Sequence, residues 1–374
     1  MQRFNTAASG VILSLVAVGL LAAGCGGEVQ GLVDCEAADG VEVVCGFENP
    51  EDLAALPGGR WIAVSQMPRM GAEGATSGSL LAWRPEDDRR VVLYPSSRPL
   101  AGDPGARFGD PACEGPPAAP DFGPHGIDVV TIPGGPTRIA VVSHGVRDSI
   151  EFFDFGFSPD GPVAQWVGCI ETPEGVWPND VVLLPSGEVI VSKMMSGTEG
   201  IQGFLDMLRM TLGLDTGFLL TWRPGGEWRE IEGTRGVAPN GVAATPDGAE
   251  VYFSEWGGER LVQVSRHRSG PPTLRSTPLP HRPDNLSWTA DGRLLVAGQV
   301  GDVADLLSCS RVKRGACPLA FSVVRVDPST LATEVILEHP GTATGAASSA
   351  LALGDDLYIG SFVGDRVGRA PYRP

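Results

Sequence analysis

A short motif of polar, apolar and turn residues repeats along this chain. In its clearest copy, Pro178-Asn179-Asp180 is followed by the apolar run Val181–Leu184, the turn Pro185-Ser186-Gly187 and a second, alternating apolar run. An apolar run, a tight turn and an alternating run predict two paired β-strands. Similar segments follow other polar positions, and the six copies begin at Glu51, His125, Asn179, Asn240, Asp284 and Ser348.

Repeats of this length, with several strands in each unit, are typical of β-propellers. The six copies therefore predict an all-β fold, a six-bladed β-propeller. An alternating segment at residues 41–44 precedes the first copy, and we expect it to pair with the last blade, built from Leu357 to about Arg369. This pairing would close the ring and remove a free strand edge. Residues 26–40 would form a tether, and residues 41–374 the propeller.

Two segments interrupt the strand pattern. Residues 199–215 carry apolar side chains at mainly helical spacing, for example at Ile201, Phe204 and Leu208, and predict a short helix inserted in the third blade. We expect this helix to cover exposed sheet; an apolar pocket or a membrane surface is the alternative partner. Residues 301–317 contain a small basic cluster and are predicted to form a loop.

The first strand of each propeller blade begins at the central channel, so the polar residues that open the motifs would converge on one axis. Taken singly, such residues could simply satisfy backbone groups at a turn. Together, carboxylate and amide oxygens from several blades suit a hard cation, and Ca²⁺ takes six to eight oxygen ligands. We therefore predict a Ca²⁺ site formed by the acidic and amide residues at these positions, Glu51, Asn179, Asn240, Asp284 and Asn285.

Residues 1–25 are predicted to be a signal peptide. The apolar stretch at residues 11–23 is too short to span a membrane stably. It ends in Leu21-Ala22-Ala23-Gly24-Cys25, which resembles a bacterial lipoprotein signal and implies that Cys25 is lipidated; an ordinary secretory signal is the alternative. Gly26 then resembles the residue that follows the cysteine in Gram-negative outer-membrane lipoproteins. The lipid anchor would be the only contact with the membrane.

The six cysteines after Cys25 form an even set in a chain expected to be exported, which favours disulfides. They allow about fifteen pairings; short loops favour Cys35–Cys45 and Cys309–Cys317, which leaves Cys113–Cys169.

The formal net charge is −17. A chain this acidic lacks the basic surface on which nucleic-acid binding depends, so no nucleic-acid partner is expected.

Several motifs together resemble the paraoxonase/arylesterase family, which is related to the gluconolactonase-type (SMP-30/gluconolactonase/LRE-like) and strictosidine-synthase-type propellers. The resemblance runs from about Glu51 to Phe362. Its segments are Glu51-Asp52-Leu53, Pro124-His125-Gly126-Ile127, Asn179-Asp180, Met210-x-Leu212-Gly213-Leu214, Asn240-Gly241 and Asp284-Asn285. It implies a catalytic Ca²⁺ on the axis, held by the five residues predicted above. It also implies a second, structural Ca²⁺ held by Asp52, Asp180 and the backbone carbonyl of Ile127.

The resemblance also implies an activity, calcium-dependent hydrolysis that opens lactones or cleaves esters. Ca²⁺ would polarise the substrate carbonyl, His125 would activate water, and His144 would orient His125. Gln299 stands about where the paraoxonase pocket has a further histidine, so the resemblance does not carry over a substrate preference. The alternative is a non-catalytic, calcium-binding propeller lipoprotein that binds a ligand or partner. A strictosidine-synthase-like condensing enzyme would not need these metal ligands.

Overall fold

The computed structural model describes residues 29–68, 78–96, 107–198, 200–266 and 270–374. The predicted signal peptide and Cys25 lie outside the described residues, so the lipid anchor stays a prediction. Within these ranges, no helix is long and apolar enough to cross a membrane.

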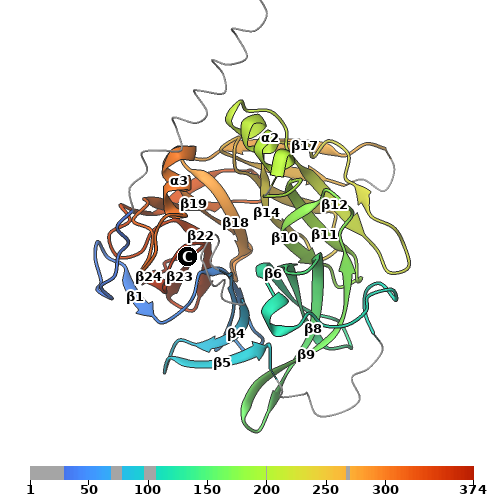
Figure 1. Cartoon of the computed structure of the whole chain (residues 1–374), viewed down its shortest axis with the longest axis horizontal. Helices are drawn as coiled ribbons and strands as arrows, with labels where there is room; N and C mark the ends of the chain where they lie inside the picture. The colour runs from blue at the N-terminus through green and yellow to red at the C-terminus, as the bar shows by residue number, and fades with distance from the viewer. Residues whose placement is uncertain (1–28, 69–77, 97–106, 199, 267–269) are drawn as a thin grey trace, which may run out of the picture.

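The described residues form six four-stranded antiparallel sheets around a central axis, as predicted (Figure 1). The first three blades consist of β2 (Pro50–Ala55), β3 (Ile62–Gln66), β4 (Ser79–Arg84) and β5 (Arg89–Tyr94); β6 (Pro124–Thr131), β7 (Thr137–His144), β8 (Asp148–Ser158) and β9 (Gly161–Glu171); and β10 (Trp177–Leu183), β11 (Val189–Met195), β12 (Phe218–Trp222) and β13 (Arg229–Glu230). The last three consist of β14 (Pro239–Ala244), β15 (Glu250–Glu255), β16 (Arg260–Ser265) and β17 (Thr273–Pro278); β18 (Arg282–Trp288), β19 (Leu294–Gln299), β20 (Phe321–Val326) and β21 (Thr333–His339); and β22 (Ala347–Leu353), β23 (Asp356–Ser361) and β24 (Arg366–Pro371) with β1 (Glu42–Cys45).

The ring closes through the N-terminal strand, as the sequence predicts. Strand β1 pairs with β24 in antiparallel register, with Glu42 opposite Arg369, and so becomes the outermost strand of the sixth blade. The described part of the predicted tether lies against the same region. Leu32 exchanges backbone hydrogen bonds with Ala316, and the buried Arg366 donates to the carbonyl of Leu32.

The first strand of every blade shifts register at the same place. The shifts lie between Pro50 and Asp52, Pro124 and Ile127, Pro178 and Val181, Pro239 and Val242, Pro283 and Leu286, and Ala347 and Ser349. A β-bulge bends its strand and re-aims the side chains beside it. The polar residue of each motif lies at or beside this irregularity, so the same local device presents a polar group to the axis in all six blades.

Neighbouring first strands approach closely and are joined by buried aspartates. A Cβ on Gly126 would lie 2.4 Å from Oδ1 of Asp180, so only glycine permits this approach. Each aspartate accepts a backbone N–H from the next blade: Asp52 from Ile127 at 2.8 Å, Asp128 from Leu183 at 2.8 Å, and Asp180 from Val242 at 2.7 Å. These bonds fix the first four blades relative to one another close to the axis.

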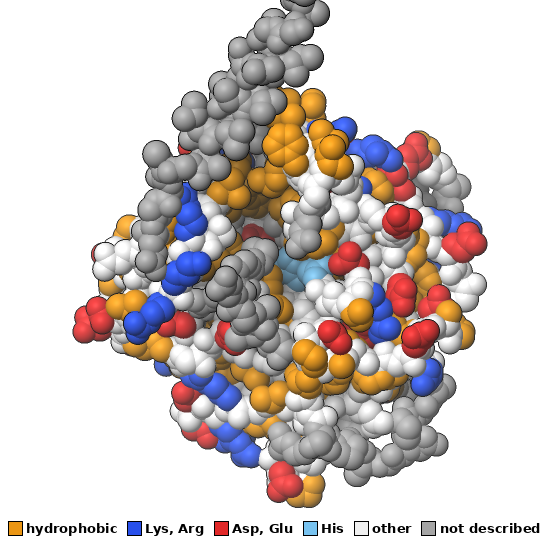
Figure 2. Space-filling model, viewed as in Figure 1, with side chains coloured by type: hydrophobic (Ala, Val, Ile, Leu, Met, Phe, Trp, Pro, Cys, Tyr) orange, Lys and Arg blue, Asp and Glu red, His pale blue; other side chains and the backbone are white. Residues whose placement is uncertain are grey.

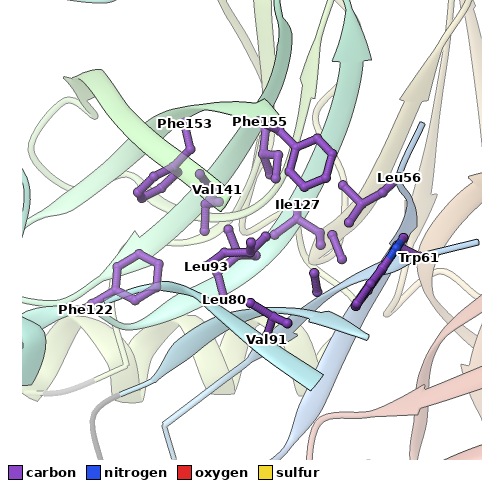
Figure 3. Packing of buried hydrophobic residues seen from close by; sticks show 14 residues of the cluster. Leu56, Trp61, Leu80, Val91, Leu93, Phe122, Ile127, Val141, Phe153 and Phe155 are labelled. Atoms are coloured by element: carbon purple, nitrogen blue, oxygen red, sulfur yellow. The ribbon is translucent and has the colours of Figure 1, made fainter. Parts of the chain in front are cut away.

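The hydrophobic core is divided among the gaps between adjacent blades. Between the first two blades, Leu56 and Trp61 belong to the same buried cluster as Phe153 and Phe155 (Figure 3). Similar clusters fill the other gaps between blades. Because both faces of each blade are buried in this way, the blades form a rigid frame for the residues on the axis.

Helix α2 (Gly200–Thr211) lies between β11 and β12, which confirms a helix inserted in the third blade. Its buried residues are Gly203, Asp206 and Met210, whereas Ile201 and Phe204 are 79% and 68% exposed. The expectation that its apolar residues cover sheet is therefore wrong for most of them. Periodicity identified the helix, but it did not determine which side faces the protein.

Residues 301–317 are not simply a loop, and that prediction is wrong in part. Helix α3 (Val303–Cys309) occupies this segment, with Asp302 and Asp305 forming a capping box at its start. The helix has only seven residues, too few for a clear helical period in the sequence. The described cysteines pair as predicted: short loops favoured Cys35–Cys45 and Cys309–Cys317, and the remaining pair is Cys113–Cys169. Three disulfides are typical of an extracellular or periplasmic protein.

Candidate metal centre and active site

A cavity of about 220 Å³ lies at the central axis, and residues of α2 and α3 form part of its wall. Figure 2 shows this hollow, with histidine at its base and hydrophobic side chains along one rim. Four of the predicted ligands line it, together with His125: Glu51, Asn179, Asn240 and Asp284. The fifth, Asn285, is adjacent, because its Nδ2 donates to Oε1 of Glu51 at 2.7 Å. The fold thus brings together residues from the first, third, fourth and fifth blades.

The sixth blade contributes to the position of Glu51 rather than to the ligand set. The hydroxyl groups of Ser348 and Ser349 both donate to the backbone carbonyl of Glu51, at 2.6 and 2.9 Å. These bonds anchor the backbone of Glu51 across the closure between the last blade and the first.

Four buried side-chain oxygens in this cluster have no hydrogen-bond partner among the described residues. They are Oε2 of Glu51 and the Oδ1 atoms of Asn179, Asn240 and Asn285. Buried polar atoms without a partner are rare and costly, and several in one place require an explanation. The amide nitrogens of Asn179 and Asn285 are occupied, by Sδ of Met194 and Oε1 of Glu51, which leaves the oxygens free. Unpaired oxygens from separate blades fit a hard cation.

The donor set is mixed rather than purely acidic. Among the described residues, no group of three or more His, Cys, Asp or Glu side chains is arranged to hold a metal ion. The candidate centre would instead combine the carboxylates of Glu51 and Asp284 with three asparagine oxygens. Such a neutral and anionic oxygen set is suited to Ca²⁺, and it offers no soft ligands to zinc or copper.

Both carboxyl groups of the centre are held in a strongly desolvating environment. Burial, followed by the nearby charges of Asp52 and Asp284, raises the pKa of Glu51 well above its ordinary value. Burial also raises the pKa of Asp284 to about 7, although hydrogen bonds from Gln299 and Asn240 lower it. A bound cation would favour the ionised forms of both groups, so metal binding and deprotonation are coupled here.

The two predicted catalytic histidines lie side by side and continue to an acidic residue. Nδ1 of His125 is 3.1 Å from Nε2 of His144, and Nδ1 of His144 is 2.7 Å from Oδ1 of Asp148. If Nδ1–H of His144 donates to Asp148 and Nδ1–H of His125 donates to Nε2 of His144, Nε2 of His125 carries the lone pair. That atom lies 3.6 Å from Oε1 of Glu51, at the metal centre.

Burial, followed by the nearby His144, lowers the pKa of His125 well below its ordinary value. His125 is therefore neutral at physiological pH and keeps the lone pair that a general base needs. The ring of Trp177 stacks on His144 with a centroid distance of 4.2 Å and an interplanar angle of 8°. This stacking restrains the imidazole that orients His125.

Sequence reasoning missed Asp148 and Trp177. The signal for Asp148 is the tight hairpin between β7 and β8, in which His144 lies directly opposite Asp148. Trp177 opens β10, two residues before Asn179, and no period or motif marked it.

The residues predicted for a second, structural Ca²⁺ are also neighbours. Both carboxylate oxygens of Asp52 and of Asp180 already accept backbone N–H groups, and one of those donors is the N–H of Ile127. Burial raises the pKa of Asp52 to about 7, and burial followed by the charge of Asp52 raises that of Asp180. These carboxyl groups have partners without a metal, so the second site stays a prediction.

The remaining wall of the cavity is mainly apolar, with Thr198 and Ser310 as its polar members. It contains neither Lys nor Arg among the described residues, and its apolar residues are Met67, Trp177, Met194, Met195, Met207, Met210, Trp256, Val303, Leu306, Leu307 and Phe362. Methionine side chains are flexible and polarisable, and they adapt to ligands of different shapes.

The fold and this axial site define a class, the six-bladed β-propellers that carry a polar site in the central channel. No family model matches the chain, and no curated protein matches its sequence. Solved structures with a similar fold do match it. A gluconolactonase from Xanthomonas campestris is 17% identical, with a TM-score of 0.53 over 93% of this chain and 98% of that one. A luciferin-regenerating enzyme is 13% identical, with a TM-score of 0.53 over 88% and 94%. At this identity the similarity establishes the fold.

Proposed function

We propose that this protein is a calcium-dependent hydrolase that opens lactones or cleaves esters. The observation that carries the proposal is the set of four unpaired, buried oxygens from four blades, which lies beside the His125–His144 pair. The fold shared with a gluconolactonase supports the same class of reaction. A fold alone never establishes an activity, so the proposal depends on the residues at the axis.

Each group at the axis has a defined task in this reaction. A Ca²⁺ held by Glu51, Asp284 and the asparagine oxygens would polarise the substrate carbonyl and stabilise negative charge on its oxygen. His125 takes a proton from the attacking water through Nε2, and His144, held by Asp148, accepts the Nδ1–H of His125 and so orients the ring. Trp177, Trp256 and the residues of α2 that line the cavity would exclude bulk water from it.

The apolar wall favours a neutral substrate with an apolar acyl or ring substituent over a polyhydroxylated sugar lactone. Each methylene buried in such a wall contributes about 0.8 kcal/mol, which is roughly a fourfold gain in kcat/KM. We expect δ-lactones with a short alkyl chain to be hydrolysed more efficiently than gluconolactone. Equal or better activity on gluconolactone would contradict this assignment of substrate class.

The direct test is calorimetric titration of Ca²⁺ into EDTA-treated protein, followed by a panel of lactones and aryl esters. Ca²⁺ binding together with Ca²⁺-dependent turnover would support the hydrolase. Ca²⁺ binding without turnover of any ester or lactone would instead favour the non-catalytic, ligand-binding propeller. Absence of Ca²⁺ binding would refute the assignment of the axial oxygens, and with it the catalytic proposal.

We further propose that the protein acts outside the cytoplasm as a lipoprotein anchored through Cys25, in the outer membrane. The three disulfides support export. Mass spectrometry of the membrane-extracted protein should find a diacylglyceryl group on Cys25; a mature chain that begins nearby without lipid would favour an ordinary secretory signal.

A further inference from the structure

Gln299 lies directly behind Asp284 and uses its whole carboxamide in hydrogen bonds. It ends β19 and is fully buried, with an exposed fraction of 0%. Its Nε2 donates to Oδ2 of Asp284 at 2.6 Å and to the backbone carbonyl of Ala347 at 2.7 Å. Its Oε1 accepts the indole N–H of Trp256 at 3.0 Å. A side chain with partners on every polar group has a single orientation.

These bonds connect three blades at the axis. Trp256 follows β15 in the fourth blade, Asp284 and Gln299 belong to the fifth, and Ala347 begins β22 in the sixth. The ring of Trp256 lines the cavity, whereas Gln299 itself does not. A continuous path of contacts therefore runs from the apolar wall, through Gln299, to a carboxylate of the candidate metal centre.

We propose that Gln299 is a positioning residue that orients Asp284 for the cation and thereby sets the affinity of the centre for Ca²⁺. This inference rests on the proposed function, because it assumes that Asp284 is a ligand. The amide holds one oxygen of the carboxylate at a fixed place, so Asp284 meets the ion with a defined geometry. Hydrogen-bonded partners behind metal ligands commonly have this role.

An amide is well suited to this position. It donates a hydrogen bond to a carboxylate without adding a positive charge that would compete with the cation. A carboxyl group there would repel Asp284 when ionised, and a lysine would neutralise the site. Glutamine therefore stabilises the ionised carboxylate of Asp284 without neutralising the negative charge that would bind the cation.

A purely structural role for Gln299 makes a different prediction, since loss of buried hydrogen bonds would lower stability without changing affinity for the ion. The test variant is Gln299→Met, which keeps the length of the side chain and removes its donors and acceptor. The matched control is Gln263→Met. Gln263 is also buried, and its Nε2 donates to Oε2 of Glu250 and to the hydroxyl of Tyr252, neither of which lines the cavity.

Calorimetric titration of Ca²⁺ into EDTA-treated protein should give Gln299→Met an affinity about 10- to 100-fold weaker than wild type. Gln263→Met should bind within about twofold of wild type. Gln299→His restores an N–H donor and should recover part of the loss. With lactone as substrate, Gln299→Met should require more Ca²⁺ for half-maximal rate, and its kcat at saturating Ca²⁺ should approach the wild-type value.

The outcomes separate this inference from the proposed function. If wild type binds no Ca²⁺, both fail together. If wild type binds and Gln299→Met binds equally well, the positioning role is overturned and the metal centre is retained. If Gln299→Met does not fold, Trp256→Phe decides the matter. It keeps a smaller aromatic ring in the wall and removes the indole N–H that fixes Oε1 of Gln299, so unchanged Ca²⁺ affinity in that variant overturns a role that depends on the fixed orientation of Gln299.

Discussion

The buried carboxyl group of Asp284 should make the stability of the metal-free protein depend on pH in an unusual direction. Burial raises its pKa from the ordinary value of 3.8 to about 7. The folded state therefore binds a proton that the unfolded state releases in this interval. The contribution of Asp284 to the free energy of unfolding is largest below pH 3.8 and decreases until about pH 7.

The size of this effect follows from the shift. Each pH unit well inside the interval corresponds to about 1.4 kcal/mol, and Asp284 is half ionised at pH 7, so about 2.3 kcal/mol is lost between pH 5 and pH 7. With an unfolding entropy of about 2 cal/mol/K per residue, 1 kcal/mol changes the Tm of a chain this long by roughly 1.3 °C. The expected change in Tm from Asp284 alone is therefore about 3 °C.

Other buried groups titrate as well, so a single profile does not isolate Asp284. Burial raises the pKa of Asp52 to about 7 and that of Asp128 to about 6, which adds to the same trend. Burial lowers the pKa of His125 and His281, and their contribution to stability increases with pH up to about 6.5. The difference between wild type and Asp284→Asn cancels the contributions of groups that the charge of Asp284 does not shift, such as Asp128 and His281, because asparagine has nearly the same shape and does not titrate. It retains the smaller part that the charge of Asp284 adds to the pKa of Glu51 and Asp52.

The assay is thermal unfolding in EDTA at pH 5, 6, 7 and 8, followed by circular dichroism. The Tm of Asp284→Asn relative to wild type should rise by about 3 °C from pH 5 to pH 7 and then level off. Ca²⁺ at pH 8 should stabilise wild type and have much less effect on the variant. Parallel pH profiles of the two proteins in EDTA would refute the reasoning, as would equal stabilisation of both by Ca²⁺.

Three further outcomes follow from the site and the ring. His125→Gln should lower kcat for lactones by about 100-fold or more while Ca²⁺ affinity stays near wild type; an unchanged kcat would remove His125 from the reaction. Glu51→Gln should abolish measurable Ca²⁺ binding in calorimetry without lowering the Tm in EDTA, because glutamine keeps the size of the side chain and an oxygen that accepts from Asn285; retained binding would exclude Glu51 as a ligand. The double variant Cys35→Ser/Cys45→Ser opens a loop with a sequence separation of 10. Its free energy of unfolding, measured with denaturant, should fall by about 2.5–3 kcal/mol. An unchanged denaturant midpoint would show that the other contacts suffice to close the ring.

Much of the fold could be predicted because it follows from local patterns. The repeated sequence of polar residue, apolar run and turn identified six blades, and the alternation at residues 41–44 identified the strand that completes the last one. Helical spacing identified α2, and short loops identified two disulfide pairs and left the third. Each of these signals depends on residues close together in the chain, where turn chemistry and side-chain periodicity act directly.

The composition of the site was predictable in part for the same reason. Glu51, Asn179, Asn240 and Asp284 open equivalent motifs, so a ring of blades places them around one axis. Their sequence positions also explain why their contacts were not predictable. Asn285 and Glu51 are 234 residues apart, and their hydrogen bond exists only because the first strands of the fifth and first blades both reach the axis.

The sequence by itself determined the number of blades, the closing strand and the residues available at the axis. The tertiary structure decided how those residues are used. The register shifts in the first strands turn the polar groups toward the channel, the packing of α2 exposes Ile201 and Phe204, and the meeting of three blades gives Gln299 its partners. Local patterns determine the secondary-structure elements because the interactions that favour each strand, helix or turn act between residues a few positions apart. Contacts between blades depend on the closed ring, and no short stretch of sequence encodes them.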